Sequence, residues 1–211
     1  MAERGGAEQI TAHLRADRRH IQDHDIEALS AAVKVKFNLE CACEEEMLAI
    51  ACRLKPDQVC LVPENRQEIT TEGGLDVVTH RDTVARSVER LHEYGIFVSL
   101  FIDPEETQIQ AASELGVEAV ELHTGAYSNA QTAEQVQEEL TKLKLASAQV
   151  AATSVRLHAG HGLNYSNVQP VAKIAGLEEL NIGHSVIARS ISVGMESAVR
   201  EMKQLISQAV S

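Results

Sequence analysis

Short runs of hydrophobic residues alternate along the chain with longer segments in which hydrophobic residues recur every three or four positions. The short runs have the length of β-strands, and the longer segments have the periodicity of amphipathic helices. The strand-like runs span residues 9–14, 36–40, 58–62, 96–102, 118–122, 154–157 and 179–182. The run at 58–62 is nearly continuous in hydrophobic residues, which indicates a strand buried on both faces of a parallel sheet.

The helical segments carry residues that start and stop helices. Asp103 and Pro104 are expected as the N-cap and first residue of one helix, and Gly95 and Gly116 as the residues that end two others. A long helix is expected over residues 132–150. The positions expected to face the core are Ile26, Leu29, Val33, Met47, Ile50, Leu54, Val84, Val88, Leu91, Val199, Met202 and Ile206.

Strands that alternate with helices, without a hairpin signal, predict parallel strands joined by right-handed crossovers. The fold class is therefore α/β, and the expected closure is a (β/α)8 barrel of the TIM type. A complete barrel has eight units in about 250 residues, or about 31 per unit, so seven visible units leave one missing. Residues 1–6 are interpreted as the tail of a helix whose strand is absent. We expect a single barrel domain over residues 1–211, N-terminally incomplete, with an open edge beside the run at 9–14.

Composition narrows the classes of partner. The formal net charge of -12 and the pI near 5.2 argue against nucleic acid and against an anionic membrane surface, because both require a basic face. The sequence has neither a membrane-spanning apolar run nor the features of a signal peptide, which predicts a cytoplasmic protein. Four cysteines in a chain of this size are interpreted as reduced thiols.

Chemically active side chains cluster where the expected strands end. Residues 155–165, with the sequence VRLHAGHGLNY, and residues 179–184, with the sequence ELNIGH, each follow a strand with glycine and histidine. Glycines there let the backbone approach a ligand, and a following helix start can bind an anion. Barrel active sites lie on this face. The candidate groups are His13, Glu40, Thr70, His123, His158, His161 and His184.

Alternative readings of these residues remain open at this point. Glu40 could form an ion pair with a loop arginine instead of acting as a base. A metal-dependent hydrolase or lyase could use the histidines, but the chain has neither an H-x-H nor an H-E-x-x-H motif. All seven lysines fall in helices or at strand beginnings, which argues against a lysine Schiff base.

Ordered motifs along the whole chain resemble those of the pyridoxine 5′-phosphate synthase family. They are TAHLRADRRHI at 11–21, NLE at 38–40, LVPE at 61–64, RQE at 66–68, TTEGGLD at 70–76, HTG at 123–125, AGHGL at 159–163 and ELNIGH at 179–184. The resemblance implies a barrel enzyme that condenses 3-amino-2-oxopropyl phosphate with 1-deoxy-D-xylulose 5-phosphate. The products would be pyridoxine 5′-phosphate, inorganic phosphate and water.

The resemblance also implies roles for individual residues. His13 and Glu40 would be proton acceptors and His161 the proton donor. Binding of the xylulose phosphate would fall to Arg15, His20 and Thr70, and binding of the amino ketone phosphate to Gly162, Gly183 and His184. Neither a metal nor a cofactor is expected, and the enzyme would be a homo-oligomer, an octamer by resemblance. The alternative is a truncated, catalytically impaired phosphate-binding barrel of the same family.

Overall fold

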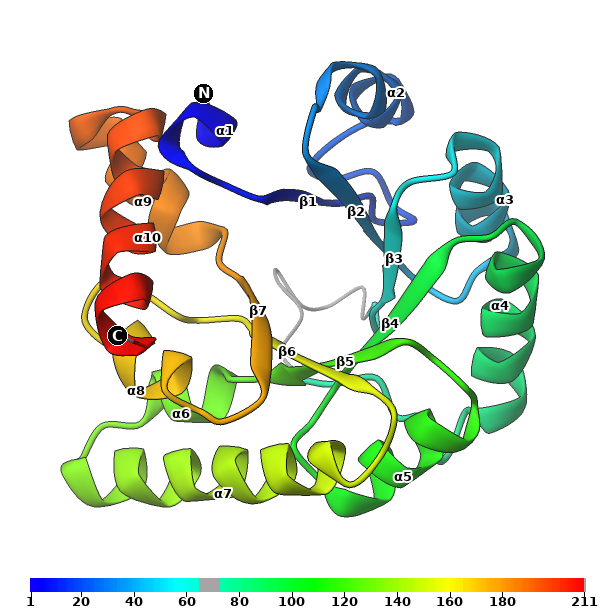
Figure 1. Cartoon of the computed structure of the whole chain (residues 1–211). Coiled ribbons are helices and arrows are strands. Elements are labelled where there is room, and N and C mark those ends of the chain that lie inside the picture. Colours follow the sequence, from blue (N-terminus) through cyan, green and yellow to red (C-terminus); the bar gives the residue numbers. More distant parts are fainter. Residues whose placement is uncertain (65–72, 211) are drawn as a thin grey trace.

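The protein has an α/β fold built on one curled sheet, seen in a computed structural model that describes residues 1–64 and 73–210 (Figure 1). Every neighbouring pair of strands is parallel, and the strands follow one another in chain order. This confirms the predicted barrel-type fold with seven strands in the described part. The strands are β1 (Gln9–His13), β2 (Lys36–Cys41), β3 (Gln58–Leu61), β4 (Phe97–Ile102), β5 (Ala119–His123), β6 (Arg156–Gly160) and β7 (Leu177–Asn181).

The helices surround the curled sheet on its outer side (Figure 1). The predicted long helix begins after Thr132, whose hydroxyl accepts the N–H of Gln135 while the Gln135 side chain accepts the N–H of Thr132. Two short helices, α6 and α8, were not predicted by the sequence pattern. The helices are α1 (Ala2–Gly5), α2 (Asp23–Ala32), α3 (Glu45–Leu54), α4 (Arg81–Glu93), α5 (Glu106–Glu114), α6 (Gly125–Asn129), α7 (Ala133–Ala151), α8 (Val168–Ala172), α9 (His184–Val193) and α10 (Met195–Val210).

The two faces of the sheet have different chemistry. Side chains alternate between the faces of each strand, and those that face the helices, such as Leu39 and Leu61, form the main hydrophobic core. The inner face is mostly polar. In β3 the inward residues are Gln58, which donates to the Ser99 hydroxyl at 3.0 Å, and Cys60. The run at 58–62 is therefore buried on both faces as predicted, but its inward face combines the polar Gln58 with Cys60 and Val62, which cluster with Phe101.

Hydrogen bonds cross the interior of the curled sheet between strands that are not neighbours. The Thr11 hydroxyl donates to Oδ1 of Asn181 at 2.9 Å, and Nδ2 of Asn181 donates to Oε2 of Glu121 at 2.9 Å. The thiol of Cys60 donates to the same carboxyl oxygen at 3.8 Å. These residues come from β1, β7, β5 and β3. Alternate strands supply each interior layer of a barrel, so this layer has barrel geometry.

An opening separates the first and last strands. Within the described residues, β1 and β7 each pair with one strand only, as the sequence count predicted. Inside the barrel, Nε2 of Gln9 donates to Oε1 of Glu179 at 2.8 Å across the opening. Outside, α1 packs against α10 so closely that a Cβ on Gly5 would lie 2.6 Å from the Glu196 carbonyl oxygen and 2.7 Å from Cβ of Val199. In the described part of the chain, side chains and a helix contact bridge the opening, but ladder hydrogen bonds do not.

The expected helix start at Asp103 was wrong. Helix α5 begins at Glu106 with Glu105 as its N-cap. The Asp103 carboxylate instead accepts the Gly74 N–H at 3.1 Å and lies 2.9 Å from Nδ1 of His123. A local cap competes with partners that folding brings near, and here the tertiary partners occupy the carboxylate.

The sixth strand extends further than the run at 154–157 predicted. It includes His158 and Gly160, which the glycine and histidine pattern had indicated as loop residues. A Cβ on Gly160 would lie 2.1 Å from Oε1 of Glu121, so this glycine makes room inside the sheet for a carboxyl group on the neighbouring strand. The glycine was interpreted as a loop signal because the sequence does not reveal which side chain it faces.

The opening predicts uneven protection of backbone amides. In β1, amides that point toward the opening should exchange with solvent on the order of tenfold faster than those of β3, because β1 has one neighbouring strand and β3 has two. Amide hydrogen exchange measured by NMR compares Thr11 with Val59 directly. Equal protection would contradict the expectation and would mean that another strand or subunit covers this edge in solution.

Candidate active site

The first group of polar side chains lies where β1 and β2 end. His13 and Glu40 are partners in the strand register, and Nδ1 of His13 lies 3.9 Å from Oε2 of Glu40. Burial raises the pKa of the Glu40 carboxyl, and the adjacent His13 offsets part of the rise. A carboxyl with a raised pKa exchanges protons closer to neutral pH. Among the described residues Glu40 makes no ion pair with an arginine, which was the alternative reading of its role.

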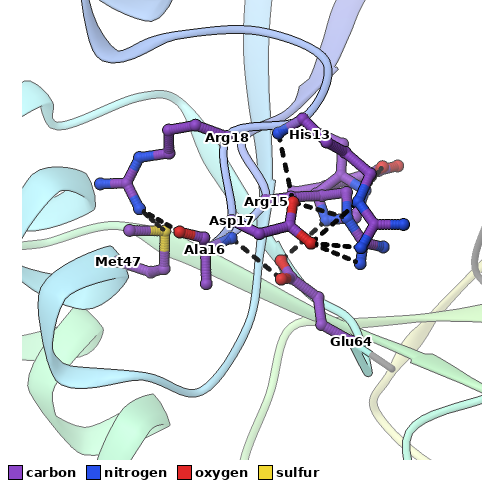
Figure 2. A network of polar contacts seen from close by, with 9 residues as sticks. His13, Arg15, Ala16, Asp17, Arg18, Met47 and Glu64 are labelled. Atoms are coloured by element: carbon purple, nitrogen blue, oxygen red, sulfur yellow. Dashed lines mark hydrogen bonds and ion pairs between the residues drawn. The ribbon is translucent and has the colours of Figure 1, made fainter. Parts of the chain in front are cut away.

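A second carboxylate, that of Glu64, contacts the other ring nitrogen of His13, and Figure 2 shows Glu64 beside the loop that follows β1. Oε1 of Glu64 lies 3.0 Å from Nε2 of His13, and Oε2 of Glu64 accepts the N–H of Ala16 at 2.9 Å. Beside them, the buried Arg15 guanidinium donates from Nε and Nη2 to the Asp17 carboxylate, at 3.3 Å each. The loop after β1 is thereby fixed to the segment that follows β3.

The second group lies where β5 and β6 end. The rings of His123 and His161 meet edge to face with centroids 5.1 Å apart, and Phe101 contacts both rings. The Asp103 carboxylate lies 2.9 Å from Nδ1 of His123, and the hydrogen bond between them holds the pKa of Asp103 below its usual value. Nε2 of His123 is buried without a hydrogen-bond partner among the described residues. This histidine is therefore held at Nδ1, and its Nε2 packs against Gly125, where a Cβ would lie 2.3 Å away.

His161 is fixed mainly through its backbone. It has a φ of 80°, a left-handed conformation that costs energy for a residue other than glycine. The Thr124 hydroxyl donates to the carbonyl oxygens of Gly160 and His161, at 2.7 and 2.6 Å. Burial lowers the pKa of the His161 ring, and His123 and His184 lower it further. The lowered pKa means that the ring is mainly neutral at neutral pH and that its protonated form is a stronger acid.

The glycines expected to bind phosphate occupy two different environments. Gly162 has a φ of 76°, and a Cβ there would lie 2.6 Å from Cβ of Ser128. Gly183 is the N-cap of α9, with His184 as the first helical residue, and both are exposed. A Cβ built on Gly183 would meet no atom of the described residues within 4 Å. The space in front of this helix start is therefore open, and the backbone N–H groups there suit an anion.

Glu121 lies between the two groups, inside the curled sheet. Its side chain is 2% exposed, and burial raises its pKa well above the usual value. The carboxylates of Glu40 and Glu179 raise it further, whereas hydrogen bonds from Asn181 and Cys60 act in the opposite direction. Glu121 is therefore a neutral, proton-holding acid over a pH range in which an exposed glutamate is ionised.

The structure does not bring every predicted residue into these groups. His20 is exposed in the loop after β1. Thr70 lies outside the described residues. His158 is buried in the interior of β6, with Nδ1 3.3 Å from Oε1 of Glu179, below the strand ends where it was expected. Strand β6 continues to Gly160, so the position of His158 is two residues before the strand end.

Three acidic residues of the site were missed as site residues by sequence reasoning. Glu64 was noted only within the LVPE motif at 61–64, Asp103 was interpreted as a helix cap, and Glu121 lay within the strand-like run at 118–122. For Glu121 a signal existed, because a glutamate at the inward position of a buried strand requires a partner. The described residues contain no group of three or more His, Cys, Asp or Glu side chains placed to hold a metal ion. They also contain no helix long and apolar enough to cross a membrane.

Comparison with known proteins identifies the family. Residues 1–208 match the family described as pyridoxal phosphate biosynthesis protein PdxJ. The chain belongs to the PdxJ family. A relative from Magnetococcus marinus, named pyridoxine 5′-phosphate synthase, is 56% identical over 209 residues, which cover 99% of this chain and 86% of the relative. A relative of the same name from Alcanivorax borkumensis is 52% identical over 206 residues, which cover 98% of this chain and 84% of the relative.

Solved structures agree on the fold of this PdxJ family member. Phosphoribosyl anthranilate isomerase from Thermus thermophilus matches with a TM-score of 0.63 at 15% identity, covering 98% of this chain and 91% of that one. The BexX/CysO complex of Amycolatopsis orientalis includes a chain that matches with a TM-score of 0.62 at 12% identity, covering 99% of this chain and 81% of that one. At these identities the likeness concerns the fold alone. The relatives named above show that this PdxJ family member is an enzyme of vitamin B6 biosynthesis.

The raised pKa of Glu121 predicts how stability depends on pH. The native state keeps the Glu121 proton at pH values where the unfolded chain, with an ordinary pKa of about 4.3, has lost it. The stabilising contribution is therefore complete below about pH 4.3 and is lost as pH rises through the native pKa. Glu121→Gln keeps the shape of the neutral acid without titrating.

The variant should match the parent at about pH 4 and should exceed it in free energy of unfolding by an amount that grows as pH rises. Urea unfolding of both proteins at several pH values measures this difference. A difference that stays constant with pH would show that the native carboxyl has an ordinary pKa.

Proposed function

We propose that this enzyme condenses 3-amino-2-oxopropyl phosphate with 1-deoxy-D-xylulose 5-phosphate to give pyridoxine 5′-phosphate, phosphate and water. Membership of the PdxJ family, with relatives named pyridoxine 5′-phosphate synthase, gives the reaction class. The observation that carries the proposal for this chain is the pair of His13 and Glu40, which are register partners at the strand ends where barrel enzymes work.

The chemistry of the condensation requires repeated proton transfer. The substrate amine attacks a carbonyl, and each later dehydration removes a proton from carbon and adds one to a departing oxygen. In the proposal, His13 and Glu40 accept the protons, and His161 across the site donates one. The raised pKa of Glu40 brings this carboxyl nearer to neutral pH, and the lowered pKa of His161 makes its protonated ring a stronger acid.

The absence of a suitable lysine agrees with a substrate amine. All seven lysines of the chain lie in the described residues. Lys36 begins β2, and the others lie in helices, at their ends or in the turn before β2. None of the seven lysines therefore lies at the strand ends, where it could form a Schiff base with a substrate. The nitrogen that attacks the carbonyl comes from the amino ketone.

The two phosphate groups are assigned to opposite sides of the site. Arg15 is assigned to the xylulose phosphate together with His20 and Thr70, and its guanidinium already neutralises Asp17. Gly162, Gly183 and His184 are assigned to the amino ketone phosphate, because the start of α9 offers N–H groups to open space. A cytoplasmic location and a homo-oligomer, an octamer by resemblance to the family, belong to the same proposal.

Replacing Glu40 by Gln tests the role of the base. The substitution preserves the shape of the side chain and removes its capacity to accept a proton, so kcat should fall by about 10²- to 10⁴-fold. A steady-state assay of product formation with both substrates measures the loss, and thermal unfolding checks that the fold is intact. A Glu40→Gln protein that turns over at the parental rate contradicts the role. A parent that binds both phosphates without forming product supports the impaired-barrel alternative.

Replacing Gly183 by Val tests the phosphate site. The new side chain has room among the described residues, none of which has an atom within 4 Å of its Cβ, but it would occupy the space of the anion. Affinity for the amino ketone phosphate should fall by about tenfold or more, or about 1.4 kcal/mol, while affinity for the xylulose phosphate changes little. Calorimetric titration with each ligand separates the two effects. Equal losses for both ligands would indicate a general folding defect.

A further inference from the structure

We propose that Glu64 is a positioning residue for His13, fixing the ring as the tautomer that carries its proton on Nε2 and leaves Nδ1 free to accept one. The inference rests on the proposed function, in which His13 is a proton acceptor. It adds a residue and a defined protonation state to that role. Figure 2 shows the arrangement, with Glu64 beneath the loop that follows β1.

The geometry around Glu64 is specific. Its side chain is 7% exposed, and its two oxygens serve different partners. Oε1 lies 3.0 Å from Nε2 of His13, and Oε2 accepts the N–H of Ala16 at 2.9 Å. Because both oxygens are engaged, the carboxylate cannot rotate without breaking one of these contacts. The His13 ring is therefore held in orientation as well as in position.

Glu64 is an acceptor at neutral pH. Burial by itself would raise the pKa of Glu64, but the hydrogen bonds from His13 and from the Ala16 N–H outweigh burial and keep the pKa below its usual value. The positive charge of Arg15 acts in the same direction. An ionised carboxylate accepts hydrogen bonds and cannot donate them. The contact at 3.0 Å therefore requires a proton on Nε2 of His13.

The consequence concerns the other ring nitrogen. In a neutral imidazole with the proton on Nε2, Nδ1 presents a lone pair. Nδ1 lies 3.9 Å from Oε2 of Glu40, which is too long for a direct hydrogen bond. Nδ1 and the Glu40 carboxyl therefore lie on either side of a short space with no direct hydrogen bond across it. A substrate proton in that space would have two acceptors, and Glu64 would stabilise the imidazolium that forms when His13 takes it.

Glu64→Gln tests the positioning of His13 while keeping the hydrogen bond that anchors the loop at Ala16. The amide oxygen can still accept the Ala16 N–H, which leaves the NH2 group facing Nε2 of His13. A donor at that point favours the opposite tautomer, which carries its proton on Nδ1. Nδ1, the ring nitrogen near Glu40, then has no lone pair with which to accept a substrate proton. We expect kcat to fall on the order of 10²- to 10⁴-fold, as when the carboxylate that orients a catalytic histidine is replaced by its amide. KM for both substrates should stay within about twofold.

Glu118→Gln is a matched control on the outer side of the molecule. Oε2 of Glu118 accepts a backbone N–H, that of Val98 at 2.8 Å, and lies 3.2 Å from Nε2 of His92. The control thus replaces, far from the site, a carboxylate that has the same two kinds of partner. It should turn over at the parental rate and should show a change in thermal unfolding similar to that of Glu64→Gln.

A second readout does not depend on activity. Nitrogen NMR of the ¹⁵N-labelled histidines should show the Nε2–H tautomer for His13 in the parent and the Nδ1–H tautomer in Glu64→Gln. Parental kcat in Glu64→Gln, or an unchanged His13 tautomer in that variant, would overturn the proposal and leave Glu64 as a loop anchor for Ala16. If the parent itself forms no product, the proposed function fails, whereas the tautomer measurement still decides the role of Glu64.

Discussion

A buried carboxyl group is the constraint on which the arrangement of this protein depends. Glu121 lies inside the curled sheet, where leaving a polar group without a hydrogen bond costs roughly 1–3 kcal/mol and leaving a charge costs more. The structure meets this cost with Asn181 and Cys60 as donors and with the strand glycine Gly160, which makes room for the carboxyl. Residues of three strands, β3, β6 and β7, thus accommodate the Glu121 side chain of a fourth strand, β5. A barrel interior made of hydrophobic side chains would not require hydrogen-bond partners placed in particular directions.

The polar interior of the sheet also connects the two groups of residues that make up the site. His13, Glu40 and Glu64 stand at the ends of β1 to β3, and His123 and His161 at the ends of β5 and β6. Glu121 lies beneath both groups, and its pKa responds to the charge on Glu40. Asn181 extends the hydrogen-bonded layer to Thr11 of β1, which spans the opening where ladder hydrogen bonds are absent among the described residues. The same side chains thus stabilise the incomplete ring and set the electrostatic environment of the proposed acids and bases.

The same arrangement of a carboxylate, a histidine and a backbone N–H occurs twice in the site. A carboxylate from a neighbouring loop contacts a histidine at the end of a strand, and the same carboxylate accepts a backbone N–H from a second loop. Glu64 does this for His13 and Ala16, and Asp103 does it for His123 and Gly74. Each carboxylate fixes a ring and a loop together, so a proton-transferring side chain can be oriented without a metal or a rigid helix. The orientation of each histidine therefore depends on two loops meeting correctly.

The sequence by itself determined the alternation of strands and helices, the parallel fold and the family, because these follow from periodicity and from ordered motifs. It also indicated His13, Glu40 and His161, since histidines and carboxylates at strand ends stand out from their neighbours. Only the tertiary structure decided which groups act on one another. It placed Asp103 on His123 instead of on a helix, put His158 inside the sheet, and gave Glu64 and Glu121 their hydrogen-bond partners. Local patterns show which face of a strand a residue occupies, but a hydrogen bond between residues about 60 positions apart depends on the curvature of the whole sheet.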